Sequence, residues 1–92
     1  MTTSHDQDCI SLEVVTPAGP VFKGSVHSFT LPTALGRIGV LRNHAPLICV
    51  VEPGPLRYES NAGAGQVDVG KGFAELHENK AVILVDAAKR VE

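Results

Sequence analysis

The chain has 92 residues, of which 43% are hydrophobic and 20% charged, and its formal net charge is −2. This length suits one domain with its own core, and the absence of any Lys/Arg cluster argues against a nucleic-acid partner, which usually meets a basic face. Cys9 and Cys49 are too few for a disulfide scaffold and form no CxxC pair, so both are expected to be free thiols in a reducing compartment.

The amino-terminal third predicts a tail followed by short strands. Residues 1–9 are expected to form a flexible tail, because they lack the basic start and apolar stretch of a signal peptide. A strand is expected at 10–15, and a turn at 16–20, where Pro fixes φ and Gly permits a positive φ. A short segment at 21–23, interrupted by Gly24, precedes a strand at 25–31.

The middle of the chain predicts two more strands between turns. A loop is expected at 32–36, a strand at 37–41 and a second turn at 42–46. The segment LICVV at 47–51 is an unbroken apolar run with mostly branched side chains. Such a run predicts a strand that is buried on both faces.

The carboxy-terminal third predicts hairpins and then a helix start. The glycine-rich loop 60–65 joins two strand segments. The segments 73–77 and 81–86 flank a tight turn in which Asn79 can take the left-handed conformation. Residues 87–92 have the composition of the first turn of a helix. Many short strands without helices between them indicate an all-β fold, either an antiparallel sandwich or a flattened barrel.

No catalytic or cofactor site is evident. The four histidines form neither an HxH nor an HExxH pattern, which argues against a metal site. His44 is the best candidate for a general base, but no activated serine or cysteine motif accompanies it. The glycines match no phosphate-binding motif. Phe22, Phe29 and Phe73 are expected to pack in the core.

A structural role for the NHAP stretch at 43–46 is favoured over a catalytic one. Asn43 and His44 can bond to nearby backbone, and Pro46 pushes Ala45 toward an extended conformation that leads into the next strand. The residues alone therefore predict a small β-domain without an evident active site, which favours a binding or structural role over catalysis. The alternatives are a ligand- or carbohydrate-binding β-sandwich, which needs exposed aromatic side chains, and an enzyme that uses His44.

Several short motifs follow one another as in a known family. They are LEVVTP at 12–17, VFKG at 21–24, LP at 31–32 with Gly36, GVL at 39–41, NHAPL at 43–47, PG at 53–54, and GFAE at 72–75 followed by VILVDA at 82–87. Their order and spacing resemble the amino-terminal domain of the epsilon subunit of F-type ATP synthases, which is called delta in mitochondria. The resemblance covers residues 10–88.

The resemblance implies a flattened antiparallel β-sandwich of about ten short strands over 10–87, with residues 88–92 leading toward a helical hairpin. It implies a non-catalytic rotor subunit without cofactor or metal, which joins the gamma subunit to the c-ring at the cytoplasmic face of a bacterial inner membrane. Thr16 and His44 would lie on the gamma side. Thr33, Ala34, Leu35 and Arg37 would face the c-ring.

Three departures from the family pattern affect the details. Family members usually continue into a carboxy-terminal helical hairpin that can inhibit ATP hydrolysis, and this short form is expected not to inhibit. Arg42 stands where the family often has proline, and Arg37 stands where some relatives carry an acidic residue. Arg37 is nevertheless expected to bind an acid or carbonyl group of the ring, because its guanidinium suits a carboxylate.

Overall fold

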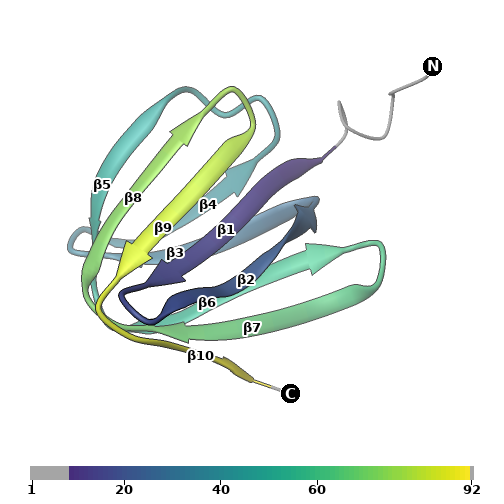
Figure 1. Ribbon diagram of the computed structural model, residues 1–92. Helices are drawn as coiled ribbons and strands as arrows, with labels where there is room; N and C mark the ends of the chain where they lie inside the picture. Colours follow the sequence, from purple (N-terminus) through teal and green to yellow (C-terminus); the bar gives the residue numbers. More distant parts are fainter. Residues whose placement is uncertain (1–8, 92) are drawn as a thin grey trace.

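The computed structural model describes residues 9–91, which form ten β-strands and no helix (Figure 1). The strands are β1 (Ile10–Thr16), β2 (Gly19–Val26), β3 (Ser28–Thr33), β4 (Gly36–Leu41), β5 (Leu47–Val51), β6 (Gly54–Ser60), β7 (Gly63–Val69), β8 (Gly72–His77), β9 (Lys80–Val85) and β10 (Ala88–Val91). This confirms the expected all-β class. The predicted tail lies outside the described residues except for Cys9, and residues 9–91 contain no helix that could cross a membrane.

Two five-stranded layers share the core. The hydrogen-bonded order is β10-β7-β6-β3-β5-β8-β9-β1-β2, and β4 pairs with β3 on its other side. Between β3 and β5 the pairing is reduced to Thr33 opposite Val51, so the sheet turns a corner there. We call β4-β3-β6-β7-β10 the β6 sheet and β5-β8-β9-β1-β2 the β8 sheet. All pairs are antiparallel except β1 with β9, which run parallel.

The core is apolar and comes from both sheets. In β1 the buried residues Ile10, Leu12 and Val14 alternate with more exposed neighbours, as the two-residue period of a strand requires. The fully buried side chains are Ile10, Leu12, Leu31, Leu56, Ile83, Val14, Val26, Val40, Val51 and Val67. Each such side chain contributes about 1.5–3 kcal/mol relative to an exposed one, so this shared interior holds the two sheets together.

Three hairpins have the same type of turn, in which a Ser or Thr is followed three positions later by glycine. In the β1–β2 turn the Oγ1 of Thr16 accepts a hydrogen bond from Ala18 N–H (3.2 Å) and donates one to Gly19 O (3.1 Å). Thr33 does the same between β3 and β4, and Ser60 between β6 and β7. The glycines adopt φ values of 108–126°, which other residues rarely reach. The sequences TPAG, TALG and SNAG therefore each encode a turn.

Side chains close the seam between the outer strands β2 and β10. The ring of Phe22 packs against that of Tyr58 with centroids 4.6 Å apart, and the guanidinium of Arg90 lies 5.3 Å from the centroid of Phe22. A cation over an aromatic face is attracted by the ring quadrupole. These contacts join β2 to β6 and β10 across the edge of the sandwich.

Three expectations about secondary structure are wrong, and one of them is the strand at 25–31, which a bend at His27 divides between β2 and β3. Ala88–Val91 forms strand β10, not a helix start, because its backbone pairs with β7, with Lys89 opposite Asp68 and Val91 opposite Gln66. Tertiary pairing overrides the weak helix preference of these residues. Gly24 does not interrupt a strand either, since β2 runs continuously through it. The division of the chain into tail, domain and tail stays a prediction.

Candidate protein-binding surface

Five apolar side chains form one continuous row on the outer face of the β8 sheet. The register places Val50 opposite Phe73, Phe73 opposite Leu84, Leu84 beside Val15 and Val15 opposite Pro20. Phe73 is 61% exposed and Leu84 52% exposed. We call these five residues the apolar row. It crosses five strands, so at about 4.8 Å per strand it is about 19 Å long.

The position of this row corrects two sequence-based expectations. LICVV at Leu47–Val51 is not buried on both faces, because Ile48 is 76% exposed and Val50 39% exposed. Phe73 likewise points outward, unlike Phe29 in the core. The described chain covers only one face of each sheet, so the second apolar face of β5, β8 and β9 meets solvent. Exposed apolar patches of this kind commonly mark protein-binding sites.

A mixed row runs beside the apolar row, two residues away along β5, β8, β9 and β1 and three residues away along β2, where a bulge shifts the register. Ile48 lies opposite Glu75, Glu75 opposite Val82, Val82 beside Glu13, and Glu13 opposite Lys23. Ile48, Phe73 and Val82 line a shallow hollow of about 190 Å³ between the two rows. The surface thus combines an apolar strip with a polar border, which is the usual composition of protein interfaces.

One end of the β8 sheet carries the turns 42–46 and 78–79, and we call it the His44 end. His44 N–H donates to Leu41 O (3.1 Å), which closes the first turn. The ring Nδ1 of His44 lies 2.8 Å from Ala45 O. Because a carbonyl oxygen can only accept, Nδ1 is the donor in this contact. Within residues 9–91, the side-chain hydrogen bond of His44 is this one with the backbone of Ala45.

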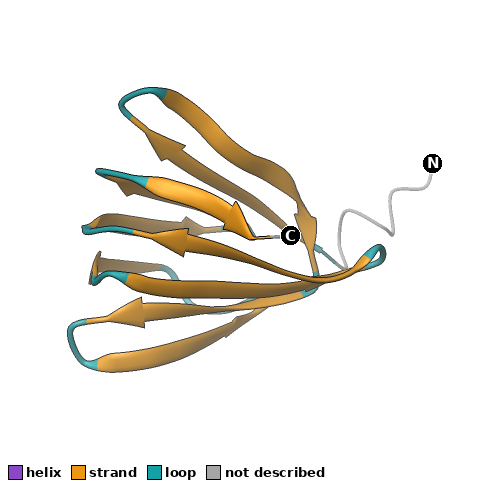
Figure 2. Cartoon of the chain, turned by 90° about the horizontal axis from the view of Figure 1, so that it is seen from below, coloured by secondary structure: helices purple, strands orange, loops and turns teal. Residues whose placement is uncertain are grey.

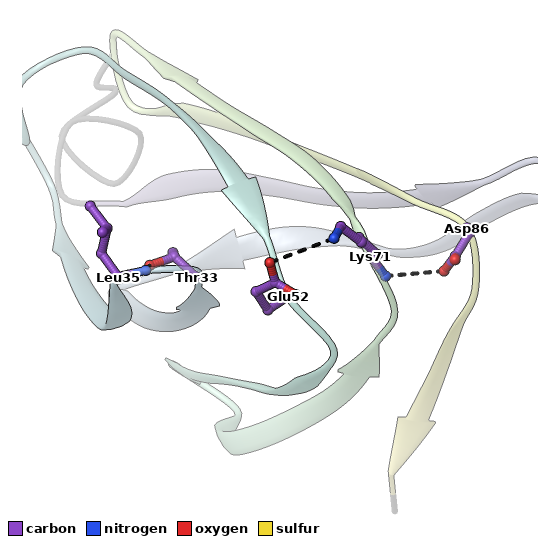
Figure 3. A network of polar contacts seen from close by, with 5 residues as sticks. All are labelled: Thr33, Leu35, Glu52, Lys71 and Asp86. Carbon is purple, nitrogen blue, oxygen red and sulfur yellow. Dashed lines mark hydrogen bonds and ion pairs between the residues drawn. The ribbon is translucent and has the colours of Figure 1, made fainter.

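The opposite end carries the turns 34–35, 52–53 and 70–71, and we call it the Leu35 end. Leu35 is 98% exposed at the tip of the β3–β4 hairpin, and Figure 3 shows its side chain extending from the turn that Thr33 stabilises. Lys71 connects the loops on either side of it. Its Nζ lies 3.8 Å from Oε2 of Glu52, and its backbone N–H donates to Oδ1 of Asp86 (3.1 Å).

Arg37 does not lie at the tip of that hairpin. It belongs to strand β4, opposite Pro32, and its Nη2 donates to the hydroxyl of Thr30 (2.6 Å) on the outer face of the β6 sheet. The guanidinium therefore turns back along the sheet. Ala34 and Leu35 remain the exposed residues of the turn itself.

The residues expected on the gamma side are not adjacent. Thr16 lies at the Leu35 end, where it lines a hollow with Lys71 and Asp86. His44 lies at the other end of the same sheet. The apolar row was not expected from the sequence, because Val50 was placed in a strand buried on both faces and Phe73 in the core. The signal was present in LICVV and AVILV, where apolar residues occupy both faces of a strand instead of alternate positions.

Further chemistry is sparse on the described part of the chain. Among residues 9–91, no three His, Cys, Asp or Glu side chains are grouped to hold a metal ion. Burial raises the pKa of the Cys49 thiol, which makes that thiol a weaker nucleophile near neutral pH. The arrangement is suited to binding another protein.

Comparison with known proteins identifies the family. The family model for the β-sandwich domain of the ATP synthase delta/epsilon chain matches residues 9–91. The chain belongs to this family. ATP synthase epsilon chains of Desulfitobacterium hafniense and Campylobacter curvus are 42% identical over 79 residues and 43% identical over 82 residues. The matches cover 86% and 88% of this chain, and 60% and 64% of those proteins. The chain thus spans less than two thirds of these epsilon chains.

Chains in solved structures have a similar fold. A chain in the cryo-EM structure of the Euglena gracilis mitochondrial ATP synthase, which contains OSCP, F1 and the c-ring, superposes with a TM-score of 0.83 at 24% identity. The match covers 90% of this chain and 54% of that one. A chain from the central stalk and c-ring of the Tetrahymena thermophila enzyme gives a TM-score of 0.71 at 19% identity, covering 86% and 64%.

Proposed function

We propose that this chain is a non-catalytic central-stalk subunit of an F-type ATP synthase. In this role it joins the gamma subunit to the c-ring, so that rotation driven by protons or sodium ions reaches the catalytic head. Family membership and the epsilon-chain relatives support this function. The apolar row is the observation that carries it, because a rotor subunit without chemistry of its own needs a large surface for a permanent partner.

The gamma subunit is proposed to cover the outer face of the β8 sheet. Standard protein interfaces bury about 800 Å² on each partner, with an apolar centre and a polar rim. The apolar row would form the centre of the interface. Glu13, Glu75 and Lys23 of the mixed row would form part of the rim, with Thr16 and His44 at its two ends.

The c-ring is proposed to contact the Leu35 end. Leu35 and Ala34 project from a turn that the Thr33 hydroxyl and Gly36 hold in one conformation. A nearly fully exposed leucine on a rigid turn is suited to insertion between the polar loops of a ring. The subunit would then be peripheral, attached through the complex to the cytoplasmic face of a bacterial inner membrane.

Calorimetric titration of this chain with the purified gamma subunit of the same organism tests the proposal. We expect a stoichiometric complex that forms without nucleotide and comigrates in gel filtration. Formation of the complex should also have a negative heat-capacity change, since apolar surface is buried. Absence of both heat and comigration would exclude the proposed role, and purification of the native synthase should independently recover gamma and c subunits with the chain.

A further inference from the structure

Two turns that are 36 residues apart are tied together at the His44 end by a pair of asparagines. The backbone N–H of Asn43 donates to Oδ1 of Asn79 (2.6 Å), and Nδ2 of Asn79 donates to Oδ1 of Asn43 (3.1 Å). The backbone O of Asn79 also accepts from Ser11 N–H (2.8 Å). Asn79 therefore links the start of β1, the turn before β5 and the turn before β9.

Turn geometry alone does not require this amide pair. Asn43 and Asn79 have φ values of 64° and 62°, which glycine reaches at no steric cost. The side chain of Asn79 adds what glycine would lack, namely one acceptor and one donor aimed at the facing turn. The amide pair thereby spans the end of β8, which lies between β5 and β9 in the sheet.

The amide pair fixes the segment that leads into the docking surface. Residues 44–46 make no ladder pairing, and the chain then enters β5, which carries Ile48 and Val50. A shift of the 42–46 turn would move His44 and change how β5 presents its outward side chains. A binding surface that is already ordered loses less conformational entropy on association.

We propose that Asn79 is a positioning residue for partner binding, because its amide holds the 42–46 turn, and with it His44 and Ile48, in the binding geometry. Asn79 need not touch the partner to have this effect. The inference rests on the proposed function, since the partner is the gamma subunit.

In this pair the side chain of Asn79 both accepts and donates, whereas the side chain of Asn43 only accepts. This difference provides a matched test. Asn79→Asp removes the Nδ2 donor and sets a carboxylate against the carbonyl oxygen of Asn43. Asn43→Asp keeps its accepting oxygen, tolerates a positive φ, and gains a charge-assisted bond from Asn79. Both variants change the net charge by the same amount at the same end of the sheet.

Calorimetry with the gamma subunit should show about a tenfold loss of affinity for Asn79→Asp and less than a twofold change for Asn43→Asp. Asn79→Gly keeps the turn but removes the amide, and should weaken binding as Asn79→Asp does. Asn79→Gly also provides the test of the positioning role if Asn79→Asp does not fold. In ¹H–¹⁵N spectra, the backbone amide of Asn43 should exchange faster in Asn79→Gly, which removes its acceptor, whereas Asn79→Asp keeps a carboxylate oxygen that can still accept from this amide.

A variant that only lowers stability separates positioning from general destabilisation. Gly65→Ala lies on the β6 sheet, away from the docking face, and should leave the affinity for gamma unchanged. Two outcomes would overturn the positioning role without affecting the proposed function. One is an equal loss of affinity for gamma in Asn79→Asp and Asn43→Asp. The other is an unchanged affinity of Asn79→Gly although its Asn43 amide exchanges faster. Failure of the unsubstituted chain to bind gamma would overturn the proposed function and this role with it.

Discussion

The outer faces of the two sheets have the same geometry and opposite chemistry. On the β8 sheet a row across five strands is entirely apolar. On the β6 sheet the corresponding row runs from Thr30 to Arg57, Gln66 and Val91 across four strands. Both faces are the solvent side of a strand alternation whose other side fills the common core. Figure 2 shows the strands of the two sheets and the short turns that join them.

The polar face satisfies its own groups, whereas the apolar face does not. Gln66 donates to Asp68 (2.8 Å) and Arg37 donates to Thr30, so the β6 sheet meets water with paired side chains. Phe73 and Leu84 have no such option, because apolar surface gains free energy only when another surface covers it. The side chains on the outer face, and not the number of strands, thus distinguish the apolar face of the β8 sheet from the polar face of the β6 sheet.

The largest expected effect comes from a charge in the middle of the apolar row. Phe73→Glu should lower the affinity for gamma by about 100-fold, because an unpaired carboxylate would be buried at the centre of the interface. Stability of the free chain should change little, since Phe73 is mostly exposed. Calorimetry and thermal unfolding measure the two quantities.

Val91→Glu is the matched control on the polar face. It also replaces an exposed apolar side chain by a carboxylate, yet it should leave the affinity for gamma within about twofold. If the two variants weaken binding equally, the distinction between the faces has no functional meaning.

Two glycines extend the comparison to the interior of each sheet. A Cβ on Gly72 of the β8 sheet would lie 1.9 Å from the backbone oxygen of Leu84, and one on Gly65 of the β6 sheet 2.3 Å from the Tyr58 ring. Backbone cannot move aside as a side chain can. Gly72→Ala should therefore cost about 3 kcal/mol and Gly65→Ala about 1–2 kcal/mol in free energy of unfolding.

Gly39→Ala is the control for Gly72→Ala and Gly65→Ala, because nothing lies within 4 Å of a Cβ at position 39. Chemical denaturation should place it within about 0.5 kcal/mol of the unsubstituted chain. A larger cost for Gly65→Ala than for Gly72→Ala would show that the Tyr58 ring is held more rigidly than the β8–β9 ladder.

A smaller effect is expected at the Leu35 end. Leu35→Asp should weaken attachment of the subunit to the c-ring several-fold, by about 1 kcal/mol, because a charge replaces the exposed apolar tip. Arg37→Glu should have less effect, since the guanidinium is turned toward Thr30. ATP-driven ion pumping in reconstituted vesicles, measured beside hydrolysis, reports both. A stronger effect of Arg37→Glu would restore the direct ring contact expected from the sequence.

The smallest effect concerns Cys49 on β5. Its pKa is raised above the ordinary value of 9.0 by burial, so the native thiol should react with iodoacetamide at pH 8 a few-fold more slowly than the same thiol in urea, measured in a Cys9→Ser background. The unfolded chain also loses this proton first as pH rises. The contribution of the Cys49 thiol to the free energy of unfolding is therefore fully present below pH 9.0. It is lost as pH rises through the pKa of the folded chain. Equal rates in buffer and urea would contradict the burial.

Local sequence was sufficient for most strands and turns. The tight turn at Asn79 was predicted and is left-handed as expected, and a turn lies within the predicted range 16–20, because Gly, Pro and Asn act through their own backbone preferences. Strand β10 was missed because its four residues have weak strand preferences. They become a strand by pairing with β7, which β8 and β9 separate from them in the sequence. The Asn43–Asn79 pair was missed because its members meet only in the folded chain.

By itself, the sequence determined an all-β domain, its turns and its family, since these depend on short-range conformational preferences and on motif order. Only the tertiary structure decided which apolar residues fill the core and which remain outside. A continuous apolar strand such as Leu47–Val51 contains no local signal for the number of layers that will cover it. Layering arises from the pairing of distant strands, and it left Ile48 and Val50 of that segment exposed on the outer face.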